Sequence, residues 1–188
     1  MIAGMYITMM PVILAGIFNM IFVKTGFYKR HRIPIDGGHV YRDGKRIFGD
    51  NKTWIGFLSM IIISMITTIL WGYLCTCFSF GNLNELYRIY DNTVLYNAGV
   101  GFYFGFSYML FELPNSFIKR RLSITPGKTE NRLFFVIDQI DSLIGVMLIL
   151  FLVSGISVWK YLFYIFLGGF THISVNFILY KLKVRRNL

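Results

Sequence analysis

Charged residues are scarce in this sequence: Asp, Glu, Lys and Arg make up 15% of the 188 residues, against roughly 25% in soluble domains. Acidic residues are the scarcest, nine against nineteen Lys and Arg, whereas hydrophobic residues make up 55%. A chain with so little charge and so much apolar sequence is expected to be an integral membrane protein rather than a soluble one. Its length fits a single domain over residues 1–188.

Cysteine and histidine are almost absent, with two and three residues. Cys75 and Cys77 lie too close in sequence for an ordinary disulfide, and no Cys and His residues have the spacing of a zinc site. The first hydrophobic stretch lacks the basic residues and the clear cleavage site of a signal peptide. The sequence therefore argues against disulfide-stapled and zinc-dependent classes, and the first stretch is expected to stay as a membrane span.

Five stretches are long and apolar enough to cross a bilayer, which takes about 20 residues. They lie at residues 2–23, 54–75, 94–113, 133–153 and 158–180. Only short segments remain between them, so the sequence predicts an all-α integral membrane protein with five transmembrane helices. In the last span, His172 and Asn176 are four residues apart, a polar pair that is expected to hold helices together.

Basic residues are concentrated in alternate loops. Residues 24–53 contain eight, residues 114–132 five and residues 181–188 four, whereas the other two loops contain one each, Arg88 and Lys160. Cytoplasmic loops of membrane proteins are enriched in Lys and Arg. The N-terminus is therefore expected outside and the C-terminus in the cytoplasm, and this topology explains the net charge of +10 better than binding to nucleic acid does.

Two carboxylates lie inside the fourth apolar stretch. Asp138 and Asp141 are three residues apart, so they share one face of a helix with Ser142. Ionisable groups at membrane depth are costly and mark functional sites, and two acids on one face suit a hard cation such as Mg²⁺. The alternative is a structural ion pair in which Lys119 or Arg120 neutralises the acids.

A cationic segment precedes this acidic stretch. Ser116, Lys119 and Arg120 have the spacing of one helical face if a new helix starts near Pro114, which is expected to end the third span. Arg121 is a weaker candidate for the same site. Carboxylates for a metal and cations for phosphates, both at the membrane, predict a site for a phosphorylated lipid and a nucleotide.

The basic segment 24–53 interleaves glycines with acids and cations. This pattern favours a lid that gathers phosphates with backbone N–H groups over a simple electrostatic anchor for anionic headgroups. Lys52 and Thr53 are candidate phosphate contacts. Asp36 and Asp50 either hold the segment together or touch the nucleotide.

The sequence resembles the CDP-diacylglycerol synthase (phosphatidate cytidylyltransferase) superfamily at two blocks. Ser116-x-x-Lys119-Arg120 followed by Asp138-x-x-Asp141-Ser142 is similar to its signature. The longer stretch Glu-Leu-Pro-Asn-Ser-Phe-Ile-Lys-Arg-Arg at 112–121, and the block at 34–56, look most like its short branch, CDP-archaeol synthase. The resemblance covers roughly residues 30 to 145.

This resemblance implies transfer of a cytidylyl group from CTP to a lipid phosphate, digeranylgeranylglyceryl phosphate, with release of pyrophosphate. It implies that the two aspartates hold Mg²⁺, that the cations at 119–121 offset phosphate charge, and that Ser116 and Ser142 orient oxygens. The site is expected to face the cytoplasm from the cell membrane, because CTP is there.

Other interpretations remain at this point. The apolar spans do not separate an isoprenoid lipid from phosphatidic acid. A CDP-alcohol phosphotransferase fits less well, because Asp36-Gly-Gly38 is not followed by Ala-Arg. A small membrane transporter whose acids bind a cation is the non-enzymatic alternative, and it leaves the glycine-rich basic segment unexplained. Gly101-x-x-x-Gly105 is a weak signal for a homodimer.

Overall fold

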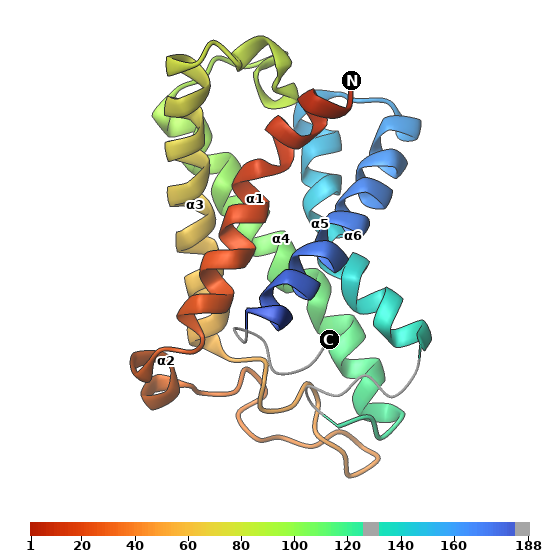
Figure 1. Ribbon diagram of the computed structural model, residues 1–188. Helices are drawn as coiled ribbons and strands as arrows, with labels where there is room; N and C mark the ends of the chain where they lie inside the picture. The colour runs from red at the N-terminus through yellow and green to blue at the C-terminus, as the bar shows by residue number, and fades with distance from the viewer. Residues whose placement is uncertain (126–131, 183–188) are drawn as a thin grey trace.

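The structure, a computed structural model, describes residues 1–125 and 132–182, and every regular element within these ranges is helical. The elements are α1 (Ile2–Phe22), α2 (Gly26–His31), α3 (Trp54–Cys77), η1 (Gly81–Leu83), η2 (Glu85–Tyr87), α4 (Val94–Arg121), α5 (Arg132–Ser154) and α6 (Val158–Lys181). The five long helices form a bundle, with segment 24–53 at one end and η1 and η2 at the other (Figure 1).

Four of these helices are long and apolar enough to cross a membrane, namely α1, α3, α5 and α6. The all-α membrane architecture is therefore confirmed. The predicted third span lies in α4, which does not reach the same hydropathy because it carries buried polar residues such as Asn97, Ser107 and Asn115. These residues face the interior, where α4 runs diagonally through the bundle between α3 and α5 (Figure 1).

The helix break expected at Pro114 is wrong. Pro114 lies inside α4, which continues to Arg121. Proline lacks the N–H that would bond the carbonyl four residues earlier, but membrane helices tolerate it where neighbouring helices compensate. The last part of the predicted span and the cationic segment are consequently one continuous helix.

The two glycines of the Gly101-x-x-x-Gly105 motif pack α4 against α3 of the same chain. A Cβ atom at either position would lie 2.6 Å from a Cα atom of α3, that of Met65 for Gly101 and that of Ile61 for Gly105. The motif thus serves internal packing, as small residues do between membrane helices. The homodimer stays a prediction and would need a different surface.

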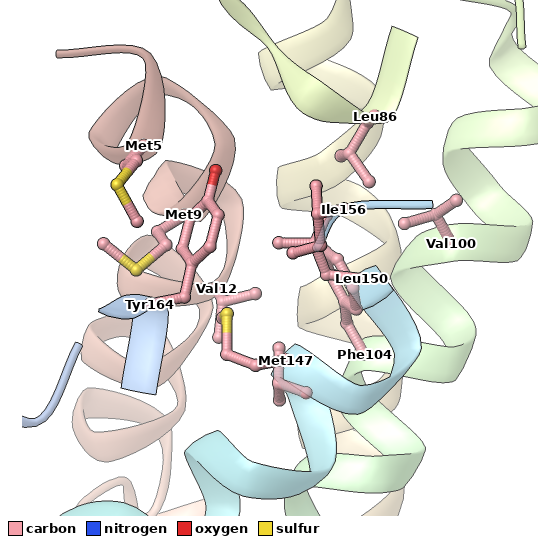
Figure 2. Close-up of a cluster of buried hydrophobic side chains, with 11 residues drawn as sticks. Met5, Met9, Val12, Leu86, Val100, Phe104, Met147, Leu150, Ile156 and Tyr164 are labelled. Carbon is pink, nitrogen blue, oxygen red and sulfur yellow. The ribbon is translucent and has the colours of Figure 1, made fainter. Parts of the chain in front are cut away.

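The apolar core lies toward the η1 and η2 end of the bundle. It joins α1, η2, α4, α5 and α6 through residues such as Met9, Leu86, Phe104, Leu150 and Tyr164, each at most 2% exposed (Figure 2). Leu86 anchors η2 in this core. A second, smaller apolar cluster, formed by Ala15, Phe57, Met60, Ile61 and Met109, joins α1, α3 and α4.

The predicted polar pair in α6 holds two helices together, as expected. The side-chain amide of Asn176 donates to Gln139 Oε1 of α5 at 2.8 Å. His172 Nδ1 lies 3.1 Å from the Gln139 carbonyl oxygen. Both contacts fix α6 against the part of α5 that carries the two aspartates.

Candidate functional site

Segment 24–53 is organised around the buried carboxylate of Asp36. This carboxylate accepts hydrogen bonds from the backbone N–H groups of Gly38, Phe48 and Gly49 at 2.9 to 3.1 Å. Arg46 Nη2 donates to it at 2.6 Å. Burial alone would raise the pKa of Asp36, but the hydrogen bonds from Arg46 and from the backbone outweigh burial and hold that pKa well below its ordinary value. The N–H cradle expected for a phosphate therefore holds Asp36 here.

Asp50 and Thr53 also have partners within the chain. Asp50 is exposed and accepts a hydrogen bond from Arg46 Nη1 at 2.7 Å. Thr53 is buried and begins α3, where its hydroxyl accepts from the Gly56 N–H at 3.1 Å and lies 2.9 Å from the Tyr28 hydroxyl. Helix capping of this kind accounts for a threonine at this position. Substrate contacts by Asp36, Asp50 and Thr53 stay predictions.

Arg121 fastens the end of α4 to segment 24–53. Its guanidinium carbon lies 5.0 Å from the ring centre of Tyr41 and 4.7 Å from that of Phe117. Its Nε is 3.0 Å from a carboxylate oxygen of Asp43, and its Nη2 donates to the Lys45 carbonyl at 3.1 Å. These contacts hold the segment against the C-terminal end of α4.

A polar cavity of about 270 Å³ lies where the end of segment 24–53 meets α4, α5 and α6. Six of the predicted site residues line it: Lys52, Ser116, Lys119, Arg120, Asp138 and Asp141. Asp36, Asp50, Thr53, Arg121 and Ser142 are not among the residues that line it. The structure thus brings the predicted acid pair and the predicted cationic face to one cavity.

The two aspartates are linked to α4 by hydrogen bonds. Lys119 Nζ lies 2.8 and 2.6 Å from the two carboxylate oxygens of Asp138. Asn115 Nδ2 donates to Asp138 Oδ1 at 2.6 Å and to Asp141 Oδ2 at 2.7 Å. The other oxygen of Asp141 accepts from the backbone N–H of Ser142 at 2.6 Å. The hydroxyl of Ser142 is buried and has no hydrogen-bond partner among the described residues.

The other two cations of the cavity differ in their partners. Lys52 forms an ion pair with Glu112. Burial alone would lower the pKa of Lys52, but the Glu112 carboxylate outweighs burial and raises that pKa. Arg120 is 8% exposed, and its Nε and Nη1 are buried without a hydrogen-bond partner among the described residues. A buried guanidinium of this kind is costly unless an anion joins it.

Among the residues of the cavity wall that sequence reasoning missed are Glu112 and Asn115. Both lie on the same face of α4 as Ser116 and Lys119, at positions i, i+3, i+4 and i+7. This spacing is visible in the sequence, but the assumed helix break at Pro114 concealed it.

The acid pair has the composition of a Mg²⁺ site that substrate phosphates complete. Within residues 1–125 and 132–182, no cluster of three or more His, Cys, Asp or Glu side chains could hold a metal. Carboxylate oxygens of Asp138 and Asp141 nevertheless converge on one atom, Asn115 Nδ2. Mg²⁺ is commonly bound by one or two carboxylates together with substrate phosphates and water, so these residues fit such an ion.

Membrane-type helices that place three carboxylates and three cations around one cavity are characteristic of an intramembrane enzyme. Residues 1–187 match the model of the CarS-like family, described as CDP-archaeol synthase. The chain belongs to this family, whose members are cytidylyltransferases. The family that the two sequence blocks resemble is therefore confirmed.

Comparison with individual relatives supports the same family assignment. The chain is 34% identical to the CDP-archaeol synthase of Thermococcus gammatolerans over 149 residues, 79% of this chain and 78% of the relative. It is 30% identical to that of Pyrococcus furiosus over 150 residues, 80% of each chain. A solved structure of an intramembrane enzyme for archaeal membrane lipid biosynthesis matches 92% of both chains with a TM-score of 0.65 and 22% identity, and it supports the fold.

Proposed function

We propose that this chain transfers the cytidylyl group of CTP to digeranylgeranylglyceryl phosphate in the membrane. A lipid phosphate oxygen attacks the α-phosphorus of CTP. The bond from that phosphorus to the oxygen bridging it to the β-phosphorus breaks, pyrophosphate leaves, and CDP-archaeol remains in the membrane. Family membership supports this reaction, since the relatives above are CDP-archaeol synthases.

The observation that carries the proposal is the distribution of charge around the cavity. Asp138 and Asp141 lie on α5, and the cations Lys119 and Arg120 lie on α4 across from them. Lys119 already neutralises one carboxylate, whereas Arg120 has no anionic partner among the described residues. A nucleoside triphosphate with a divalent cation would satisfy both the acids and the cations, because its phosphates would pair with the guanidinium and the divalent cation would bind the carboxylates.

The residues of the cavity then have separate roles. Phosphoryl-group transfer depends on positioning and charge neutralisation more than on covalent catalysis. Arg120 would bind phosphate oxygens, and Lys119 would stand between the acid pair and the phosphates. Ser116, which lies on the same face of α4, would orient a substrate oxygen. Asp138 and Asp141 would hold Mg²⁺, which supplies charge neutralisation and alignment of the phosphate groups when bound.

An apolar groove beside the cavity suits the lipid tail. It lies between α1, α5 and α6 and is lined by residues such as Met9, Val12 and Met147. The groove and the polar cavity share Met20 and Tyr108 in their walls. An amphiphilic substrate would therefore place its phosphate in the polar cavity while its chain stays in the apolar groove.

The topology that fits this function has five spans, with the cavity open to the cytoplasm. The alternating basic segments support this orientation. Segment 24–53 and the basic end of α4 also lie at the same end of the bundle (Figure 1). With 28 residues, α4 is about 42 Å long at 1.5 Å per residue, enough to cross a hydrocarbon core of roughly 30 Å although its hydropathy is low.

Incorporation of labelled CTP into lipid by the purified protein tests the proposal. Digeranylgeranylglyceryl phosphate and phosphatidic acid would be offered side by side, each with and without Mg²⁺. We expect metal-dependent product from the isoprenoid lipid. Product from phosphatidic acid alone would support cytidylyl transfer but would show that the proposed lipid substrate is wrong. Folded protein that forms no product from either lipid and does not bind CTP with Mg²⁺ would overturn the proposed function in favour of a transporter.

A further inference from the structure

Asn115 connects the two aspartates of the cavity. Its Nδ2 is within 2.7 Å of a carboxylate oxygen of Asp138 and of Asp141. The two hydrogens of one amide nitrogen thus satisfy two carboxylates on successive turns of α5. Two acids this close need a positive partner between them, and in this structure the amide nitrogen takes that place.

The other end of the same amide has no partner. Asn115 Oδ1 is buried and accepts no hydrogen bond from the described residues, and the residue as a whole is 7% exposed. Buried carbonyl oxygens are rarely left unsatisfied, and each such group calls for an explanation. Asn115 also lines the polar cavity, so the unpaired oxygen belongs to the wall of the site.

Both observations have one explanation. Rotation of the amide exchanges its nitrogen and its oxygen, which have nearly the same shape, so it requires little repacking. A cation between the two carboxylates would repel the NH₂ hydrogens and attract the oxygen. Amide carbonyl oxygens are ligands for hard divalent cations. We propose that Asn115 turns its amide when a cation binds and supplies Oδ1 as a third protein ligand beside Asp138 and Asp141.

Among the other polar groups near the acids, the Ser142 hydroxyl and Asn176 Oδ1 are also buried without a partner in the described part of the chain, but neither residue is hydrogen-bonded to both aspartates. Glu112 is paired with Lys52, and the Gln139 side chain oxygen accepts from Asn176. Lys119 repels a cation. Asn115 is therefore the neutral oxygen donor that is in contact with both aspartates. This inference rests on the proposed function, because it assigns a residue to the metal site of that reaction.

A thiol at position 115 tests whether this side chain touches the metal. Thiolate prefers soft cations, whereas amide and carboxylate oxygens prefer Mg²⁺ and Mn²⁺. Mn²⁺ binding to the purified, nucleotide-free protein would be followed by the electron paramagnetic resonance signal of free Mn²⁺, and Cd²⁺ binding by thiolate-to-cadmium absorption. The matched control is Asn176→Cys, which places a thiol in the same cavity wall at a residue that bonds Gln139 instead of the aspartates. Wild type gives the background of Cys75 and Cys77.

We expect Asn115→Cys to weaken Mn²⁺ binding roughly tenfold to a hundredfold and to gain cadmium–thiolate absorption and Cd²⁺ affinity that Asn176→Cys and wild type lack. Asn115→Asp keeps an oxygen at the same place and should bind Mn²⁺ at least as tightly as wild type. This second variant guards against misfolding of the first.

Equal loss of Mn²⁺ and Cd²⁺ affinity in folded Asn115→Cys would overturn the inference, since Asn115 would then only position the two carboxylates. An unchanged Mn²⁺ affinity in that variant, or no Mn²⁺ binding by wild type, would overturn it as well. Lipid labelling from CTP by wild type separates the two proposals. If wild type labels lipid from CTP but the thiol of Asn115→Cys gains no Cd²⁺ site, the inference about Asn115 is wrong and the proposed function stands. If wild type does not label lipid, the proposed function is wrong.

Discussion

Replacement of Arg120 by Met should stabilise the protein without nucleotide and abolish its activity. Two guanidinium nitrogens of Arg120 are buried without a partner among the described residues. A buried polar group left unsatisfied, here the guanidinium as a whole, costs about 1–3 kcal/mol, and Met fills a similar volume with no polar atom. We therefore expect the free energy of unfolding to rise by about 1–3 kcal/mol. For a chain of this size, that change shifts the Tm upward by roughly 2 to 10 °C.

Thermal unfolding in detergent, with and without CTP and Mg²⁺, measures this effect. Nucleotide at a hundred times its Kd should stabilise wild type by about 2.7 kcal/mol, and Arg120→Met should lose most of that gain. Arg46→Met is the matched control: Arg46 is bonded to the buried Asp36 carboxylate, so its loss should destabilise the protein. If ligand-free Arg120→Met unfolds at a lower temperature than wild type, Arg120 is not a destabilising, unpaired charge in the free protein, and its proposed role as an anion-binding residue is refuted.

Three further changes test the surrounding structure. Gly145→Ala should lower the free energy of unfolding by about 1–3 kcal/mol and lower activity, because the added Cβ would lie 2.5 Å from the Phe111 ring and 2.8 Å from a backbone oxygen of α4. Gly99→Ala is the control for unfolding and for activity, because a Cβ at Gly99 would have nothing within 4 Å. Thr53→Ala should cost about 1 kcal/mol through the lost cap with an unchanged KM for CTP, and a raised KM would instead favour a phosphate contact. Because the folded-state pKa of Asp36 is depressed, its contribution to stability is present above the unfolded pKa of about 3.9 and is lost as pH falls toward the folded pKa. Hydrogen exchange of residues 33–53 should therefore stay slow at pH 5 to 7 and accelerate in Asp36→Asn at the same pH; equal exchange in both proteins would contradict the role of Asp36.

The helices were predictable because their signals are local. The predicted spans at 2–23, 54–75, 133–153 and 158–180 each agree with a helix to within two residues at either end. Long apolar runs and the short polar segments between them are enough for such predictions. The predicted end of the third span is wrong, because Pro114 does not end the helix. In the folded bundle, the proline lies within α4, whose neighbours α3 and α5 pack along it.

The candidate site was predictable where it depended on spacing along one helix. The faces carrying Asp138 and Asp141, and Lys119 and Arg120, follow from helical periodicity. Contacts between distant segments were not predictable. No local pattern shows that the Asp36 carboxylate accepts hydrogen bonds from its own segment, or that Arg121 donates to the Lys45 carbonyl.

The fate of the α-phosphorus of CTP is the most direct test of the proposed cytidylyl transfer. Purified wild type and Asp141→Asn would be given digeranylgeranylglyceryl phosphate with Mg²⁺ and CTP labelled at either the α- or the γ-phosphorus. We expect that wild type moves the α-label into lipid and the γ-label into pyrophosphate, and that Asp141→Asn does neither. Full α-label transfer by Asp141→Asn, or γ-label in the lipid of wild type, would contradict it.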